Sequence, residues 1–253
     1  MNALYDLNGK TAIVTGASRG LGYGIAEGFV EHGMTVAIVA SSDRIFEAEK
    51  KLNKYGTCKA FKIDVQDEVQ REMFFADALN YLGGKLDVIV NCAGIQYRSQ
   101  SEDFPLEQWQ KVLDINLTAV FHLSKLAGQV MLKQKHGKII NIASMLSFFG
   151  GYTVPAYAAS KGGIAQLTKA LSNEWAQYGI NVNALAPGYM ATEMNAALST
   201  PDSPRYASIT ARIPAKRWGT EQDMKGPALF LASSMSDYLN GAIIPVDGGY
   251  LSC

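Results

Sequence analysis

Cysteine, excess charge of either sign and long apolar runs are all scarce in this sequence. The three cysteines, Cys58, Cys92 and Cys253, are odd in number and far apart, so they predict neither a disulfide framework nor a metal site. Lys plus Arg and Asp plus Glu both number 23, which leaves no basic excess for nucleic acid or an anionic membrane surface. No apolar run approaches the roughly 18 residues that span a bilayer, and the N-terminus lacks a signal-peptide pattern. These absences predict a cytoplasmic protein that acts on a small molecule, without metal, membrane or nucleic acid.

Short β-branched runs alternate with longer amphipathic stretches along the 253 residues. Runs with apolar residues on both faces suit strands that helices cover on both sides. The pattern predicts one α/β domain over residues 1–253, of the Rossmann type, with a doubly wound, seven-stranded parallel sheet and helices on both faces. The expected strands are 11–15, 35–39, 59–63, 86–90, 138–142, 181–185 and 242–246, and the expected helices include 22–32, 68–81, 107–134 and 157–178.

Residues 189–214 interrupt this alternation. The segment contains Pro201, Pro204 and Pro214 among small and polar residues, and it follows the sixth expected strand. Ligands of such sheets bind beyond the carboxyl ends of the strands. We therefore expect a mobile lid of short helices over a substrate, with a variable surface loop as the alternative.

A glycine-rich stretch joins the first expected strand to the first helix. Glycines there allow a tight turn and close approach of the backbone to a pyrophosphate, and the helix N-terminus offers free N–H groups. In this strand–helix context the stretch predicts a dinucleotide site. The residues assigned to it are Gly16, Ser18, Arg19, Gly20, Leu21 and Gly22.

The end of the second strand bears on the kind of dinucleotide. An acidic residue there would bind the ribose 2′-hydroxyl of NAD, but residue 40 is alanine. The hydroxyls of Ser41 and Ser42, with Arg19 and Arg44 close by, suit a 2′-phosphate. We therefore expect NADP(H) to be favoured over NAD(H), with Asp43 as the residue that could instead serve NAD.

Polar and small residues follow the third and fourth strands as well. Asp64 and Val65 come after the third, and Asn91, Ala93 and Gly94 come at the end of the fourth. These positions suit contacts to the adenine and to the nicotinamide ribose. Ordinary turn chemistry is the alternative, because Asn, Asp and Gly are common loop residues.

A serine, a tyrosine and a lysine form the candidate catalytic group. Ser144 closes the fifth strand, and Tyr157 and Lys161 follow at i and i+4 on one face of a helix. A phenol with a pKa near ~10 is a poor base, and a neighbouring ammonium together with the positively charged nicotinamide lowers that pKa. Tyr157 is thus the candidate acid/base, Ser144 the group that polarises a carbonyl oxygen, and Lys161 the phenol's partner and a ligand of the nicotinamide ribose.

Taken together, these motifs resemble the short-chain dehydrogenase/reductase family over essentially the whole chain. The resemblance implies that Asn116 completes a catalytic tetrad and holds a water in a proton relay. It also implies that Pro187, Gly188, Met190 and Thr192 contact the nicotinamide end of the cofactor, although a β-branched residue is usual at position 190. A homotetramer is implied too, with the helices over 107–134 and 157–178 packing between subunits.

Residues 137–148, 186–192 and 212–219 look more specifically like the 2-dehydro-3-deoxy-D-gluconate 5-dehydrogenases, a group that typically uses NAD. The resemblance implies a hydroxyl–ketone interconversion on a six-carbon sugar acid. Such a substrate needs a cation for its carboxylate, hydroxyl groups for its oxygens and a pocket wall. The candidate substrate residues are Arg98 and Arg217 as cations, Tyr152 and Tyr189 as hydroxyl donors, Met145 as wall and Ser144 at the reacting oxygen.

Three other functions remain open on the sequence. A 3-oxoacyl-(acyl carrier protein) reductase would also fit the Ser18–Arg19–Gly20 loop and the end of the second strand. A general carbonyl or sorbose-type reductase is a further alternative. A dinucleotide-binding regulator without catalysis is the alternative from another class, but such proteins usually lose the Tyr or the Lys.

Overall fold

Seven parallel strands form one sheet in the computed structural model, which describes residues 5–200 and 202–252. They lie side by side in the order β3-β2-β1-β4-β5-β6-β7. The change of direction between β1 and β4 creates a topological switch point, where ligands of such sheets bind. This architecture confirms the predicted Rossmann-type fold. The strands are β1 (Thr11–Thr15), β2 (Thr35–Ala40), β3 (Thr57–Lys62), β4 (Val88–Asn91), β5 (Gly137–Ile142), β6 (Ile180–Pro187) and β7 (Ile243–Val246).

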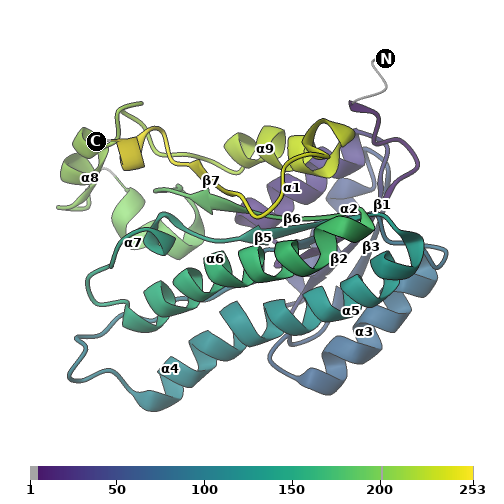
Figure 1. The fold of residues 1–253 in the computed structure, drawn as a ribbon. Coiled ribbons are helices and arrows are strands. Elements are labelled where there is room, and N and C mark those ends of the chain that lie inside the picture. Colours follow the sequence, from purple (N-terminus) through teal and green to yellow (C-terminus); the bar gives the residue numbers. More distant parts are fainter. Residues whose placement is uncertain (1–4, 201, 253) are drawn as a thin grey trace.

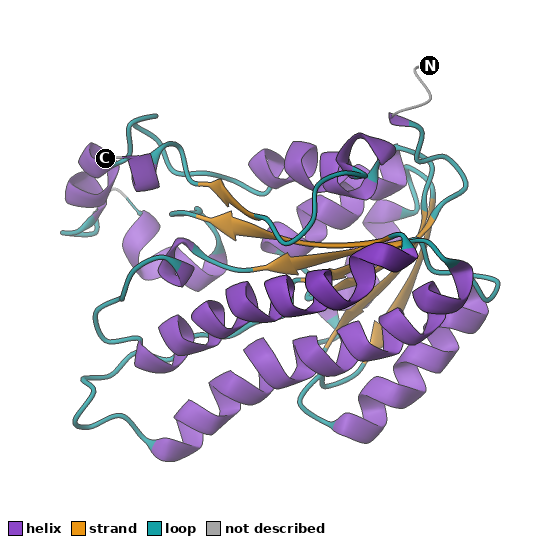
Figure 2. Ribbon diagram, in the orientation of Figure 1, coloured by secondary structure: helices purple, strands orange, loops and turns teal. Residues whose placement is uncertain are grey.

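Helices cover both faces of the sheet (Figure 1). One face carries α1, α2 and α9, and the opposite face carries α3, α5 and α6, with α4 packed beside α6. The strand arrows in Figure 2 point toward the side where the short helices α7 and α8 lie. The helices are α1 (Gly20–Glu31), α2 (Arg44–Leu52), α3 (Glu68–Tyr81), α4 (Leu106–Leu113), α5 (Ala119–Gln134), α6 (Pro155–Trp175), α7 (Ala196–Ser199), α8 (Tyr206–Arg212) and α9 (Gln222–Ala232).

Alternate side chains of the central strands supply the two halves of the core. In β1, Val14 packs toward α1 and α9, whereas Ile13 packs toward α3 and α5. Both side chains are fully buried. Because every central strand is buried on both faces, its sequence reads as a continuous apolar run rather than as an alternating one. The rigid sheet fixes the positions of the loops at its carboxyl edge.

The predicted element boundaries agree with the structure to within a few residues, with one informative exception. The expected helix over 107–134 consists of α4, a π-helical turn (Asp114–Thr118) and α5. A π turn inserts an extra residue into a helix and is frequent at functional sites. Here it contains the buried Asn116.

Residues 189–214 contain short helical pieces rather than a strand or a long helix. A 3-10 turn (Glu193–Asn195) leads into α7, and α8 follows residue 205. Ile209 and Ile213 of this segment pack on Trp218 and Tyr250. Within the described part of the chain, no helix is long and apolar enough to cross a membrane.

Candidate active site

Ser144 lies at the carboxyl end of β5, where the chain turns into a short 3-10 turn (Met145–Ser147). Its hydroxyl oxygen accepts a hydrogen bond from the Leu146 backbone N–H at 3.1 Å. The Ser147 hydroxyl accepts one from the Ser144 N–H at 3.3 Å and donates one to the Lys161 carbonyl at 2.6 Å. The Ser144 side chain is therefore fixed by the backbone that follows it.

Tyr157 and Lys161 lie one turn apart in α6, as their spacing predicts. The Lys161 ammonium lies 5.6 Å from the centre of the Tyr157 ring and donates to the Ile142 carbonyl at 2.6 Å. Tyr157 also forms a hydrogen bond with the Ser144 side chain. The structure thus brings Ser144, Tyr157 and Lys161 together from β5 and α6.

Burial dominates the acid–base properties of this group in the protein alone. It raises the pKa of Tyr157 to about 12, although the hydrogen bond from Ser144 acts in the opposite direction. It lowers the pKa of Lys161 to about 8, because a buried ammonium loses its hydration. The lowered phenol pKa that the sequence led us to expect is therefore not a property of the protein by itself. It requires a further positive charge beside the phenol.

Asn116 approaches the same group from the π turn between α4 and α5. Its amide oxygen accepts from the Ile95 N–H at 2.9 Å, and its amide nitrogen donates to the Ile95 carbonyl at 2.9 Å and to the Ser160 hydroxyl at 3.1 Å. A Cβ built on Gly94 would lie 3.3 Å from the Asn116 oxygen and 3.9 Å from the Lys161 nitrogen. Asn116 thus fixes the loop after β4 against the catalytic helix.

The β1–α1 turn has the geometry of a phosphate cradle. Gly16 has a φ of +68°, and a Cβ there would lie 2.8 Å from the Ala93 Cα, while a Cβ on Gly22 would lie 2.5 Å from the Gly16 carbonyl oxygen. No side chain caps α1, and its first turn contains no acidic residue. The glycines therefore let the turn pack closely against the loop after β4, and the uncapped start of α1 offers backbone N–H groups and a positive helix end, which fits a dinucleotide pyrophosphate. Ser18, Gly20 and Leu21 lie in the same turn.

The two arginines predicted to bind a 2′-phosphate do converge, but on a protein carboxylate. Arg19 Nε lies 3.1 Å from Glu193, and Arg44 Nη1 lies 3.0 Å from each oxygen of the same carboxylate. Ser41 and Ser42 lie between the end of β2 and α2.

Asp43, the residue that could have served NAD, is held elsewhere. Its carboxylate accepts a hydrogen bond from the Lys62 ammonium at 2.8 Å. Reaching a ribose hydroxyl would require Asp43 to leave this ion pair.

Of the residues after β3 and β4, some contact only the surrounding loop and others are buried in the core. The Asp64 carboxylate is exposed and accepts from the Gln66 N–H, whereas Val65 is buried beside Ala93. Asn91 differs from the prediction, because its amide nitrogen donates to Ser124 and to Asn141 inside the core. Its side chain connects neighbouring strands rather than facing a ligand. The sequence alone cannot show whether a side chain at the end of a strand points into the core or toward a ligand.

The chain after β6 reaches the phosphate turn. Pro187 closes β6, and the Gly188 N–H donates to the Val246 carbonyl at 3.0 Å. The Met190 side chain is buried in the core, so only its backbone is available to a cofactor. Thr192 lies beside Gly20, since a Cβ on Gly20 would be 3.6 Å from the Thr192 methyl group.

Arg98 lies in the loop after β4, which the Ser99 N–H attaches to the Thr153 carbonyl just before α6. With its amide in the orientation that satisfies both atoms, Gln96 accepts from Arg98 Nε at 3.0 Å and from Nη2 at 3.1 Å. Burial, followed by the nearby charge of Arg205, lowers the pKa of Arg98. The charge of Arg205 therefore acts on Arg98, and no ion pair to either guanidinium group is found within residues 5–200 and 202–252.

The remaining substrate candidates lie in different environments. Arg217 forms a two-fold ion pair with Asp223 at 2.7 and 2.8 Å, which raises the pKa of Arg217. Tyr152 is 89% exposed. Tyr189 packs against Trp218 with ring centroids 5.2 Å apart. Met145 is buried in the same cluster. The structure thus packs Met145 and Tyr189 into one cluster with Trp218, leaves Tyr152 exposed and engages Arg217 with Asp223.

Two charged residues that the sequence analysis did not single out lie at the site. Glu193 follows Thr192 directly, and Arg205 precedes α8. Both belong to the segment 189–214, and both act on residues more than 100 positions away in the chain. In the sequence, the only signal for a role of these two residues is that they are charged and lie within the predicted lid.

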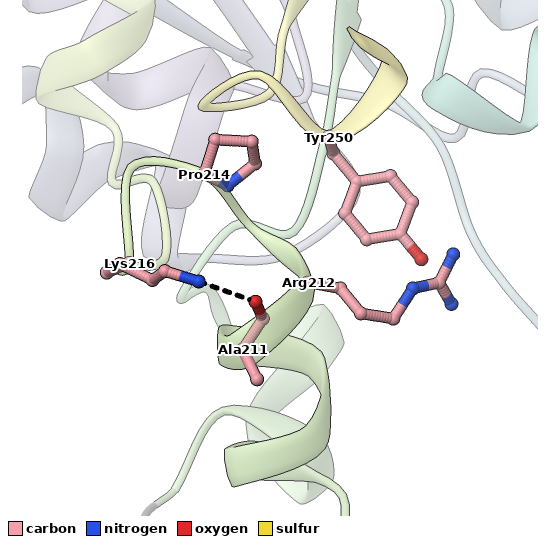
Figure 3. A pocket seen from close by; sticks show the side chains of 5 residues that line it. All are labelled: Ala211, Arg212, Pro214, Lys216 and Tyr250. Carbon is pink, nitrogen blue, oxygen red and sulfur yellow. Dashed lines mark hydrogen bonds between the residues drawn. The ribbon is translucent and has the colours of Figure 1, made fainter. Parts of the chain in front are cut away.

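A separate pocket of about 560 Å³ lies outside this group (Figure 3). The Arg212 guanidinium lies 4.7 Å from the centre of the Tyr250 ring, and the Lys216 ammonium donates to the Ala211 carbonyl at 2.7 Å. Pro214 completes the lining. The pocket lies between the end of α8 and the C-terminal turn, and none of the candidate catalytic residues lines it.

Glu68, Glu72 and His122 are close enough together to be considered as metal ligands. Arg71 Nε, however, donates to His122 Nδ1 at 3.1 Å. The neutral imidazole proton then resides on Nε2, which faces Glu72 at 3.6 Å. An N–H group rather than a lone pair points at the carboxylates, so this arrangement does not suit a metal.

Comparison with known proteins shows which enzymes this chain is similar to. A family profile described as Enoyl-(Acyl carrier protein) reductase matches residues 16–251. A 2-dehydro-3-deoxy-D-gluconate 5-dehydrogenase of Bacillus subtilis is 46% identical over 249 residues, which cover 98% of this chain and 97% of that protein.

Solved structures agree with this placement. A protein of Agrobacterium tumefaciens described as a gluconate dehydrogenase superposes with a TM-score of 0.95 at 44% identity, and the match covers 100% of both chains. A gluconate 5-dehydrogenase from Burkholderia cenocepacia, in complex with NADP and tartrate, gives a TM-score of 0.93 at 36% identity, covering 99% of this chain and 98% of the other.

Proposed function

Since the chain belongs to the short-chain dehydrogenase/reductase family of NAD(P)-dependent oxidoreductases, we propose that it interconverts a secondary hydroxyl and a ketone on a six-carbon sugar acid. The proposed substrate is 2-dehydro-3-deoxy-D-gluconate. The charge of Arg205 acts on the guanidinium group of Arg98, and this supports an acid, because two cations without a protein counter-ion among the described residues suit a carboxylate. This observation favours a sugar acid over a 3-oxoacyl thioester or a general carbonyl compound.

In the proposed mechanism, the chain binds, orients and moves a proton. A bound nicotinamide dinucleotide accepts the hydride in oxidation and supplies it in reduction. The Ser144 hydroxyl hydrogen-bonds the reacting oxygen, and Tyr157 lies beside Ser144 to exchange the proton with that oxygen. Lys161, positively charged below a pKa of about 8, stabilises the phenolate that oxidation requires. Asn116 holds the loop after β4, and with it Gly94, against Lys161.

NADP(H) is the proposed cofactor. Arg19 and Arg44 already converge on one anionic group, and Asp43 is engaged by Lys62. Both features favour a 2′-phosphate over a bare ribose. The Burkholderia relative was found with NADP bound, which supports binding of NADP(H).

We also propose a homotetramer built through α4, α5 and α6, in the cytoplasm. Leu106 of α4 is 83% exposed, and Phe121 of α5 is 47% exposed. Apolar side chains exposed on a helix face favour contact with another subunit. Residues 189–214 act as a lid over the substrate in this proposal, because they carry Arg205 to the site.

The substrate proposal is tested by initial rates on 2-dehydro-3-deoxy-D-gluconate, D-gluconate and an acetoacetyl thioester, with NAD(H) and NADP(H) in parallel. Turnover confined to the thioester would contradict it. Arg98→Gln and Arg205→Gln should each raise KM for the sugar acid about 10- to 100-fold, with a smaller change in kcat. The methyl ester of the acid should be insensitive to both substitutions, because it carries no charge. Arg217→Gln should have a smaller effect than either, since Arg217 is engaged by Asp223.

Replacing Tyr157 distinguishes an enzyme from a dinucleotide-binding regulator. Tyr157→Phe removes only the phenolic oxygen, so kcat should fall by about 10³-fold while the dissociation constant for NADP(H) stays nearly constant. Tyr238→Phe makes the same chemical change on a fully exposed side chain and serves as the control. Undetectable turnover in the wild type, with intact NADP(H) binding, would favour the regulator.

A further inference from the structure

We infer that Glu193 is a specificity-determining residue, whose carboxylate competes with the 2′-phosphate of NADP(H) for Arg19 and Arg44. The inference deepens the proposed cofactor preference and rests on it. It concerns the first residue of the 3-10 turn that opens the lid segment, which the catalytic mechanism does not use.

The contact occupies the donors that a phosphate would need. Glu193 forms an ion pair with Arg19 Nε, in the phosphate turn before α1, and accepts hydrogen bonds from Arg44 Nη1, at the first position of α2. One carboxylate thus bridges the two elements that flank the end of β2. Guanidinium groups bind carboxylates and phosphates through the same N–H donors, so the two anions compete for them.

Short local contacts hold Glu193 in this position. The Asn195 N–H donates to the Thr192 carbonyl at 2.9 Å, and the Asn195 amide nitrogen donates to the Met190 carbonyl at 3.0 Å. Ala191 is attached to Gly219 through its own N–H at 2.8 Å. These hydrogen bonds attach the turn Glu193–Asn195 to the residues that follow β6. The Glu193 carboxylate is therefore presented to the arginines by a fixed turn.

The contact is nevertheless weak enough to be displaced. The side chains of Arg19, Arg44 and Glu193 are 52%, 55% and 59% exposed, and ion pairs this exposed contribute little to stability. A phosphate carries more charge than a carboxylate and should take both arginines. Glu193 then lowers the affinity for NADP(H) without excluding it, and has no such effect on NAD(H), which places no charge there.

Displacement also couples the cofactor to the lid. Glu193 connects the lid segment to the two arginines, so a ligand that occupies them removes one of the contacts that hold the turn Glu193–Asn195. Coupling of this kind is reciprocal, because whatever stabilises the Glu193 contact weakens binding of the 2′-phosphate. NADP(H) and NAD(H) would then leave the start of the lid in different states.

Binding of two small adenosine probes tests the inference without turnover. Adenosine 2′,5′-bisphosphate carries the 2′-phosphate, and adenosine 5′-monophosphate lacks it. Glu193→Gln should tighten the bisphosphate by at least about 5-fold and change the monophosphate by less than about 2-fold. Asp202→Asn is the matched control, because it removes an exposed lid carboxylate that forms no ion pair within the described ranges. Hydrogen exchange of residues 190–200 should rise on adding the bisphosphate to the wild type, and not on adding the monophosphate.

The possible results separate this inference from the proposed cofactor preference. Unchanged or weaker bisphosphate binding in Glu193→Gln would overturn the inference, since a carboxylate that orients the arginines would behave in that way. If Arg44→Gln still weakens the bisphosphate, the cofactor site stands without the competition. If wild type, Arg44→Gln and Glu193→Gln all bind the two probes equally, both the site and the inference are wrong. Turnover of sugar acids affects none of these binding constants.

Discussion

At the scale of single residues, the site combines reacting groups with burial that opposes their ionisation. Burial raises the pKa of Tyr157 and lowers that of Lys161, so it shifts both groups toward their neutral forms, although Lys161 stays mostly protonated at pH 7. A phenol that stays protonated is ready to donate in reduction. Oxidation needs the additional positive charge of an oxidised nicotinamide, so the proton transfer depends on the cofactor being bound.

The lowered pKa of Lys161 predicts a pH dependence of stability. Its pKa is about 8 in the folded protein against an ordinary value of 10.5, so between these values the unfolded chain binds more protons. The free energy of unfolding should therefore rise with pH over this window, by about 1 kcal/mol between pH 7 and 9 from this group. Urea unfolding of the wild type and Lys161→Met at both pH values gives the contribution as a difference.

Lys50→Met, on the exposed face of α2, is the control for that measurement. It should retain the rise seen in the wild type. A Lys161→Met protein whose stability rises with pH as steeply as the wild type would show that Lys161 does not titrate in this range.

The sequence predicts reacting residues better than it predicts their charged neighbours. Ser144, Tyr157 and Lys161 are brought together by one strand end and one helical turn, which are local features. Arg44 and Glu193 are 149 positions apart and meet because the loops after β2 and β6 share one edge of the sheet. Asn91 shows the same limit, since only the packed core decides that its side chain turns inward.

At the scale of elements, close backbone approach shapes the phosphate turn. Thr15 Oγ1 accepts hydrogen bonds from the N–H groups of Cys92 and Ala93, both at 2.9 Å, and draws the loop after β4 against the turn after β1. Gly16 is the residue that permits this approach, because it combines a positive φ with contact to the Ala93 backbone. The glycine pattern predicts this turn from the sequence, because glycines are needed wherever the backbone packs this closely. The π turn that carries Asn116 could not be predicted in this way, because its sequence is compatible with an ordinary helix.

Two glycine substitutions separate the contact from the backbone conformation. Gly16 and Gly83 have φ values of +68° and +72°, but only Gly16 has a neighbour within 4 Å of a built Cβ. Gly83→Ala should cost about 1 kcal/mol of unfolding free energy from conformation alone. Gly16→Ala should cost clearly more and abolish dinucleotide binding, as measured by urea unfolding and by titration with NADP(H). Equal losses of stability in both variants, with binding retained in Gly16→Ala, would mean that the loop after β4 moves aside easily.

At the scale of the whole molecule, the helix layer that contains α4 and α5 exposes large apolar side chains. Helices α1, α2 and α9 cover one face of the sheet, and α3, α5 and α6 cover the other (Figure 1). Leu106 of α4 and Phe121 of α5 are nevertheless exposed. Burial between subunits would explain why apolar residues occupy these exposed positions. Periodicity alone could not indicate this, because an apolar helix face can equally serve the protein's own core.

The proposed homotetramer can be tested by placing a charge on this face. Phe121→Asp puts a carboxylate where the proposal buries an aromatic ring, and an unpaired charge in an interface is strongly unfavourable. Sedimentation velocity at micromolar concentration should show a tetramer for the wild type and smaller species for Phe121→Asp. Tyr55→Asp, on the 56% exposed side chain between α2 and β3, is the control and should remain tetrameric. A wild-type monomer would refute the proposal. A tetrameric Phe121→Asp would instead move the interface away from α5, and the exposed ring would then need another explanation.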